Sequence, residues 1–109
     1  MSPTVNVNPK AVADIDDHAF YLGAEVDTEL CLRFLDAADS SFALLATEPE
    51  MGWRPRIRHP RLKGVRMWRI TGFEDMLVFY RPQPNGVDIL RIVNGKRNLR
   101  KFLRQEGLE

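Results

Sequence analysis

Two histidines and one cysteine are the side chains of this sequence most able to do acid–base or nucleophilic chemistry. His18 lies among acidic residues in a predicted helix, which favours a solvated histidine over a general base. His59 lies in a basic loop and has no carboxylate near it in the sequence, so a catalytic role for it is only an alternative. Cys31 is on a predicted helix, where a cysteine is most often a small buried hydrophobic residue.

The acidic residues near the N-terminus do not form a metal site. Asp14, Asp16 and Asp17 lack the spacing and the glycine of a calcium-binding loop. The sequence has no glycine-rich phosphate loop and no His-Glu pair for zinc, and a single cysteine excludes an internal disulfide. No catalytic site, metal or cofactor is therefore expected.

The distribution of basic residues is the clearest pattern in the sequence. Residues 1–50 contain ten acidic and two basic residues, whereas residues 51–109 contain five acidic and fourteen basic residues. Seven Lys or Arg and no acidic residue lie between Glu50 and Glu74. This asymmetry favours a basic surface that binds phosphate or an acidic partner. The alternative is an ordinary surface of solvated charges.

Residues 62–97 predict three consecutive antiparallel strands, because three apolar runs alternate with short segments rich in Gly, Pro, Asn and Asp. Side chains alternate between the two faces of a strand, so the arginines can be assigned to a face. One assignment places Arg69, Arg81 and Arg91 together on an open face, above an apolar floor. The covered face then holds Trp68, Ile70, Met76, Val78, Tyr80, Leu90 and Ile92. A register shift of one residue would break this pattern.

Helices are predicted on both sides of this meander. Residues 4–8 could form a short edge strand, and apolar residues at helical spacing predict a helix over residues 10–22 that Gly23 ends. A second helix should begin at Asp27 or Thr28 and end near Ala46. The short connection predicts an antiparallel helical hairpin, and its apolar stripes must pack on the sheet.

The remaining segments are strongly basic. Residues 53–63 are a predicted loop, in which Arg54, Arg56 and Arg58 would project to one side of an extended chain. Residues 96–105 predict a basic C-terminal helix. Trp53 could pack within the loop or contact a partner.

The length of 109 residues predicts one domain, residues 1–109, with a genuine core. No apolar run approaches the roughly 20 residues needed to cross a membrane. The first ten residues lack the basic start and apolar centre of a signal peptide. We therefore expect a cytoplasmic protein.

Several short motifs, taken in order, resemble the ParE branch of the RelE/ParE toxin superfamily. They are PEMG at residues 49–52, LKGVRMW at 62–68, GF at 72–73, LVFYR at 77–81, GVDILRIV at 86–93 and GKR at 95–97. The resemblance covers nearly the whole chain. It implies an α+β fold of order β-α-α-β-β-β-α, with a helical hairpin packed on a small antiparallel sheet and a basic C-terminal helix.

The resemblance also implies the toxin of a type II toxin–antitoxin pair, in a hetero-oligomer with a small ParD-like antitoxin. ParE-type members inhibit DNA gyrase and break no bond themselves. RelE-type members cut messenger RNA on the ribosome, using basic residues on the sheet and a terminal tyrosine or histidine.

The motif positions favour the ParE branch. Leu77 stands where RelE-type nucleases have an arginine, and Phe102 or Leu103 stands where they have a tyrosine. Many relatives have a histidine at the position of Asn94. The predicted function is therefore gyrase inhibition without catalysis.

Two alternatives stay open. One is a RelE-type ribonuclease, with His59, Arg81 and Arg97 as its catalytic residues. The other is a non-toxic relative that only binds the antitoxin. In every case the predicted contacts with the target or antitoxin are Arg69, Arg81, Arg91, Arg97 and Trp53.

Overall fold

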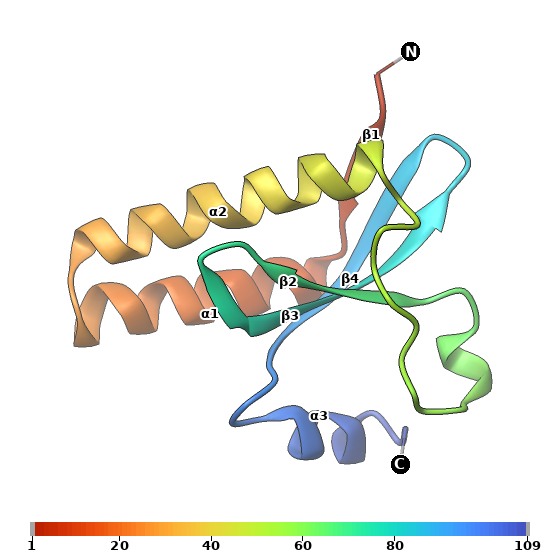
Figure 1. Cartoon of the computed structure of the whole chain (residues 1–109). Helices are drawn as coiled ribbons and strands as arrows, with labels where there is room; N and C mark the ends of the chain where they lie inside the picture. The colour runs from red at the N-terminus through yellow and green to blue at the C-terminus, as the bar shows by residue number, and fades with distance from the viewer. Residues whose placement is uncertain (1, 109) are drawn as a thin grey trace.

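Apolar residues repeat at the spacing of strands or helices along this chain, and the elements form where these repeats occur. The computed structural model describes residues 2–108. Its elements are β1 (Thr4–Val7), α1 (Pro9–Glu25), α2 (Thr28–Thr47), the one-turn 3-10 helix η1 (Pro60–Leu62), β2 (Arg66–Ile70), β3 (Phe73–Gln83), β4 (Gly86–Asn94) and α3 (Leu99–Gln105) (Figure 1). This confirms the predicted α+β class and the order β-α-α-β-β-β-α.

The four strands form one sheet in the order β1-β4-β3-β2. Strands β2, β3 and β4 form the predicted antiparallel meander. Strand β1 pairs in parallel with β4, so the whole sheet is mixed. Gly86 lies at this parallel contact with a φ of 146°. A Cβ atom at Gly86 would lie 1.9 Å from the carbonyl oxygen of Thr4, so β1 can approach β4 only because this residue is glycine.

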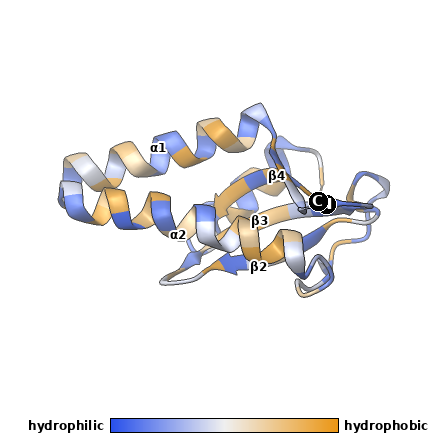
Figure 2. Cartoon of the chain, turned by 90° about the horizontal axis from the view of Figure 1, so that it is seen from above, coloured by the Kyte–Doolittle hydropathy of each residue, from blue (hydrophilic) through white to orange (hydrophobic). Residues whose placement is uncertain are grey.

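Helices α1 and α2 form the predicted antiparallel hairpin, which covers one face of the sheet and extends past its edge (Figures 1 and 2). The side chain of Asn8 caps α1, and the side chain of Asp27 accepts a 2.7 Å hydrogen bond from the amide of Leu30 to cap α2. The prediction that Gly23 ends the first helix is wrong. Helix α1 continues to Glu25, and Gly23 packs beside Cys31 of α2 instead.

The larger core lies between the hairpin and the sheet. Both helices and all four strands contribute apolar side chains to it, and the largest fully buried ones belong to Tyr80, Phe34, Leu45, Ile70, Ile89, Val78 and Val87. This burial holds the hairpin against the sheet, because apolar area removed from water stabilises a fold by about 25 cal/mol per Å². Trp68, predicted to lie on this face, is half-buried and packs against the same core.

The sequence suggested that the opposite face of the sheet is open, but this face is partly covered. Helix α3 supplies Phe102 to a second apolar cluster on this face. The buried members of the cluster are Val65, Met67, Leu77, Phe79, Val93, Phe102 and Leu108. The apolar floor predicted beneath the arginines therefore exists, but Phe102 and Leu108 pack on it. The physical reason is that this floor is too apolar to stay in water when an amphipathic helix follows β4 directly.

A bulge in β4 corrects the predicted position of Leu90. Phe79 pairs with Arg91, but the next residue of β3, Tyr80, pairs with Ile89, so Leu90 has no partner across the strands. The extra residue reverses the alternation of side chains. Leu90 therefore packs with the second cluster, while Val87 and Ile89 face the helices.

Buried Tyr80 fixes the start of the basic loop. Its hydroxyl donates to the carbonyl oxygen of Pro49 at 2.6 Å and accepts from the amide of Gly52 at 2.9 Å. The next residue, Trp53, forms an isolated antiparallel bridge with Met67 of β2. These contacts attach residues 49–53 to the edge of the sheet, from which the rest of the loop departs.

Candidate functional site

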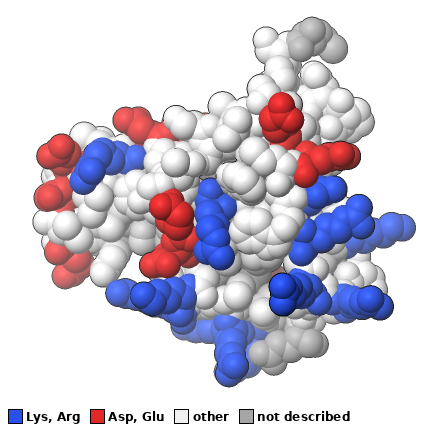
Figure 3. Space-filling view, viewed as in Figure 1, with Lys and Arg blue, Asp and Glu red and all other residues white. Residues whose placement is uncertain are grey.

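Charges of opposite sign occupy different parts of the surface, as the sequence predicts. In Figure 3, most Lys and Arg side chains lie over the long loop and around α3, whereas Asp and Glu concentrate on the helical hairpin and near the top of the view. Several hollows adjoin this basic part of the surface, and we consider three of them in turn.

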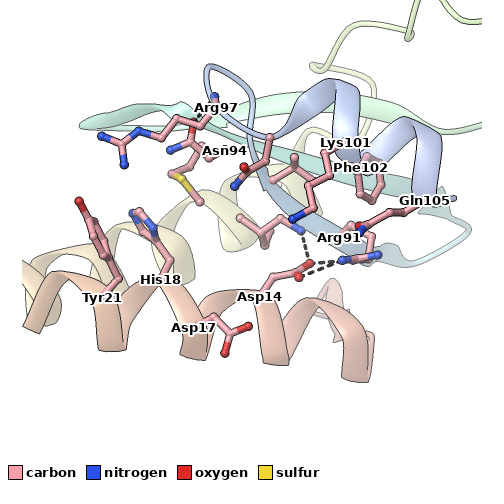
Figure 4. A pocket seen from close by; sticks show the side chains of 14 residues that line it. Asp14, Asp17, His18, Tyr21, Arg91, Asn94, Arg97, Lys101, Phe102 and Gln105 are labelled. Carbon is pink, nitrogen blue, oxygen red and sulfur yellow. Dashed lines mark hydrogen bonds and ion pairs between the residues drawn. The ribbon is translucent and has the colours of Figure 1, made fainter. Parts of the chain in front are cut away.

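The first hollow is a cleft of about 400 Å³ between α1 and the connection from β4 to α3. His18 and Tyr21 project into it from α1, opposite Arg97 (Figure 4). Its lining also includes Asp14, Asp17, Arg91, Asn94, Asn98, Lys101 and Gln105. The predicted contact residues Arg91 and Arg97 therefore share one cleft.

Asn94 positions Arg97 at the mouth of this cleft. The side-chain oxygen of Asn94 accepts hydrogen bonds from the amides of Lys96 and Arg97, at 3.1 and 3.0 Å. Because this polar turn occupies the residues after β4, the last helix begins at Leu99 and not at residue 96 as predicted. Within the described chain the Arg97 side chain has no hydrogen-bond or ion-pair partner and is exposed, so its guanidinium group is available to a ligand.

His18 is a cleft residue that the sequence did not identify. Its ring lies 4.7 Å from the ring of Phe34 in an edge-to-face contact and 5.9 Å from that of Tyr21. Burial and, secondarily, the charge of Arg97 lower the pKa of His18 below its usual 6.5. The imidazole is therefore neutral at pH 7. A sequence signal did exist, because Asp14, His18 and Tyr21 are spaced by four and three residues and so share one face of a helix.

Arg91 connects three elements of the fold. Its Nε and Nη2 atoms donate to the two carboxylate oxygens of Asp14 at 2.8 and 3.1 Å. Its Nη1 atom donates to Glu106, and its guanidinium group lies 5.0 Å from the centre of the Phe102 ring. The hydrogen bond with Asp14 is the main cause that raises the pKa of Arg91. Arg91 thus forms the wall shared by the first and second hollows.

The second hollow is a groove of about 280 Å³ on the other side of Arg91, and it contains Arg81. The Nη2 atom of Arg81 donates to the carbonyl oxygen of Arg61 at 3.4 Å. Arg61 in turn donates to Glu106, with its Nη2 atom 3.4 Å from that carboxylate. Apolar side chains form the rest of the floor, among them Val65, Phe79, Leu90 and Leu108.

The third hollow, of about 260 Å³, contains the other two predicted contact residues, Arg69 and Trp53. The guanidinium group of Arg69 lies 5.5 Å from the centre of the Trp53 ring. Trp53 and Trp68 have ring centres 6.2 Å apart. Arg69 pairs with Leu77, four residues before Arg81 on β3, so about 13 Å of strand separates Arg69 from Arg81. The three strand arginines share one face, as predicted, but do not form one cluster.

His59 lies at the start of the short helix η1. Its Nδ1 atom accepts a 3.2 Å hydrogen bond from the amide of Arg61 and caps the short helix η1. His59 lines none of the hollows described above, Arg81 lines only the groove, and Arg97 lines the cleft. The three residues proposed for a ribonuclease therefore share none of these three hollows.

The fold and these hollows define a class of small α+β domain in which a helical hairpin covers one sheet face and cationic clefts flank the other. Residues 5–99 match the family model described as ParE toxin of type II toxin–antitoxin system, parDE. The chain belongs to the ParE toxin family, and it is the toxin component of a type II toxin–antitoxin system.

A similar fold occurs in a solved structure described as the chromosomal ParDE TA system from P. aeruginosa. The two chains have a TM-score of 0.65 and 20% sequence identity, over 84% of this chain and 95% of the other. No curated protein matches this sequence. None of the helices within residues 2–108 is both long and apolar enough to cross a membrane.

Proposed function

We propose that this protein inhibits DNA gyrase and is neutralised by a cognate ParD-like antitoxin in a toxin–antitoxin hetero-oligomer. Membership of the ParE family over residues 5–99 is the observation that carries this proposal. The chemistry of the clefts supports it, because they offer charged donors for binding a protein surface.

The antitoxin, in this proposal, presents acidic side chains to the cleft and the groove. Arg97 and Arg81 supply the donors, since an arginine can hold a carboxylate through two parallel hydrogen bonds. Arg91 is already bonded to Asp14 and Glu106, so its contribution is to shape the wall between the two hollows. Arg69 and Trp53 belong to the same face but form a separate contact site.

Two observations favour gyrase inhibition over RNA cleavage by the residues named from the sequence. The first is that His59, Arg81 and Arg97 line no common hollow. The second is that Leu77 and Phe102, at the positions of RelE-type catalytic residues, are buried apolar side chains. General acid–base cleavage needs a group that can exchange a proton within reach of the 2′-hydroxyl.

A supercoiling and cleavage assay tests the proposal. Purified protein is added to gyrase and supercoiled DNA, with and without the cognate antitoxin. Accumulation of gyrase-linked DNA breaks, reversed by the antitoxin, is expected. Arg97→Ala should weaken reversal by the antitoxin, while Arg33→Ala, an exposed arginine on α2, serves as the matched control. Unchanged gyrase activity at saturating toxin would contradict the proposed target.

A ribosome-dependent ribonuclease is the second candidate, and His18 is the observation that favours it. A neutral imidazole beside Arg97 and Tyr21 has the composition of a site that cleaves RNA, with the imidazole as base and the guanidinium group as phosphate ligand. A translating extract with primer-extension mapping tests it. RNA cuts that disappear in His18→Ala would favour this candidate, whereas activity in neither assay would indicate a non-toxic relative that binds antitoxin only.

A further inference from the structure

The basic loop carries three arginines that the fold itself does not use. From Arg54 to Arg58 the arginines at alternate positions are exposed, while Pro55 and Ile57 between them are half-buried. Among residues 2–108 the side chains of Arg54, Arg56 and Arg58 have no hydrogen-bond or ion-pair partner. The loop thus presents three unpaired guanidinium groups in a row along the chain, at every second position, and its backbone bends at Arg56 instead of running straight as the sequence predicted.

An aromatic pair begins this row. Trp53 directly precedes Arg54, is 38% exposed, and lies against Trp68 in the third hollow described above. Its backbone is fixed to β2 by hydrogen bonds with Met67, from Trp53 N to Met67 O at 3.0 Å and from Met67 N to Trp53 O at 2.7 Å. The two indole rings are therefore held in place by the sheet, while the arginines extend away from it.

We propose that Trp53 and the loop arginines form a binding site for single-stranded nucleic acid. Proteins that bind single strands combine aromatic side chains on which bases stack with a basic track for the backbone. Three exposed arginines, Arg54, Arg56 and Arg58, supply the positive charge of such a track.

An acidic peptide is a weaker match to this surface. The carboxylates of such a peptide would bind the arginines, and its binding would not require stacking on the tryptophan pair. The free cations also differ in place from those of the cleft, because Arg97 and Lys101 lie at the far end of β4 and on α3. This site shares Trp53 with the contact site of Trp53 and Arg69 proposed above, but its existence does not depend on whether gyrase is the target.

Intrinsic tryptophan fluorescence reports directly on this site, since Trp53 and Trp68 are the two tryptophans of the chain. The full-length protein is titrated with a thymidine 12-mer, its duplex with an adenine strand, and a glutamate 12-mer. Quenching by the single strand is expected. For each tenfold rise in salt concentration, the affinity should fall by about 0.7 logarithmic units per phosphate contact. Equal quenching by the glutamate peptide or by the duplex would overturn the proposal.

Variants with equal charge loss locate the site. Replacing Arg54, Arg56 and Arg58 together by Ala should weaken binding of the single strand by about tenfold or more and reduce the salt slope by about 2. The matched control replaces Arg33, Lys96 and Arg100 by Ala, which removes the same charge elsewhere and should leave the slope nearly unchanged. Equal weakening in both variants would show a general charge effect and refute the site.

A tryptophan variant separates stacking from charge. Trp53→Ala should weaken binding by about fivefold while leaving the salt slope unchanged, because a stacked base contributes without releasing counterions. Trp68 still reports binding in this variant, and circular dichroism checks that the fold is kept. Wild-type affinity in Trp53→Ala would overturn the stacking part of the proposal and with it the preference for single strands.

Discussion

Asp14 of α1 accepts hydrogen bonds from Arg91 of β4 with both carboxylate oxygens, and it also accepts a 2.9 Å hydrogen bond from the amide of Ile92. The parallel pairing of β1 with β4 stops at Val7 and Ile89, so this part of β4 pairs with β3 on one side and has no neighbouring strand on the other. The Asp14 carboxylate takes the place of a strand and satisfies the Ile92 amide. One helix residue thus joins the hairpin, the edge of the sheet and the wall of the cleft.

Removing this carboxylate should destabilise the fold. Asp14→Ala leaves the Ile92 amide and one side of the Arg91 guanidinium group unpaired, and we expect the free energy of unfolding to fall by about 2 kcal/mol. The estimate is moderate because both side chains keep some contact with water, at 17% and 26% exposure. Urea unfolding measures it. Asp17→Ala, at an exposed position one turn away, should change stability little, and equal losses in the two variants would contradict the account.

The two partners should also be coupled in a double-mutant cycle. If Asp14 acts through Arg91, the variant with Asp14→Ala and Arg91→Ala should lose less stability than the sum of the single variants. Strict additivity would mean that Asp14 acts through the Ile92 amide alone.

Buried Tyr80 should be required for the position of the basic loop. In Tyr80→Phe the Pro49 carbonyl and the Gly52 amide lose their partner, and we expect a loss of about 2 kcal/mol in unfolding free energy. Hydrogen exchange of the Gly52 amide should become faster. Tyr21→Phe, which removes an exposed hydroxyl, is the control, and protection of Gly52 as in the wild type would show that another contact holds the loop.

Two glycines with positive φ should respond differently to alanine. A Cβ at Gly86 meets the backbone of Thr4, so Gly86→Ala should cost about 3 kcal/mol and release β1 from the sheet. Gly72, with a φ of 85°, has nothing within 4 Å of the added Cβ. Gly72→Ala should therefore cost only about 1 kcal/mol of backbone strain. Thermal unfolding of the two variants compares them, and similar costs would contradict the role of the parallel contact.

Stability should depend on His18 as the pH falls. The pKa of His18 is lower in the folded chain than the usual 6.5, so the folded state favours the neutral imidazole. Its contribution to stability is complete above pH 6.5 and is lost as the pH falls through the lowered pKa. The difference in unfolding free energy between pH 7 and pH 5 should therefore shrink in His18→Gln. The same pH dependence in both proteins would assign it to other groups in the cleft.

Arg81 should affect partner binding without affecting the fold. It makes a single hydrogen bond, to the Arg61 carbonyl, and lines the groove. Arg81→Ala is expected to weaken antitoxin binding by about tenfold, the loss of one charged hydrogen-bonded contact. Isothermal titration measures the affinity and urea unfolding the stability. If growth arrest and antitoxin binding are both unchanged, Arg81 is outside the binding surface.

Local patterns were enough to predict the elements and their order. The spacing of apolar residues and the positions of Pro, Gly, Asn and Asp reflect interactions between close neighbours in the chain. They gave the meander, the hairpin with its second helix starting at Asp27 or Thr28, and the common face of Arg69, Arg81 and Arg91. The charge division was also readable, because it depends on composition alone.

The tertiary structure decided which of these charges are free. Leu90 changed faces because of a bulge that depends on cross-strand pairing, and α3 covered a face that looked open from its pattern. Arg91 is paired with Asp14, which is seventy-seven positions away in the sequence. His18 lines a cleft only because β4 and α3 lie opposite α1. Periodicity fixes which side of an element a residue occupies, whereas its neighbours there depend on how distant elements pack.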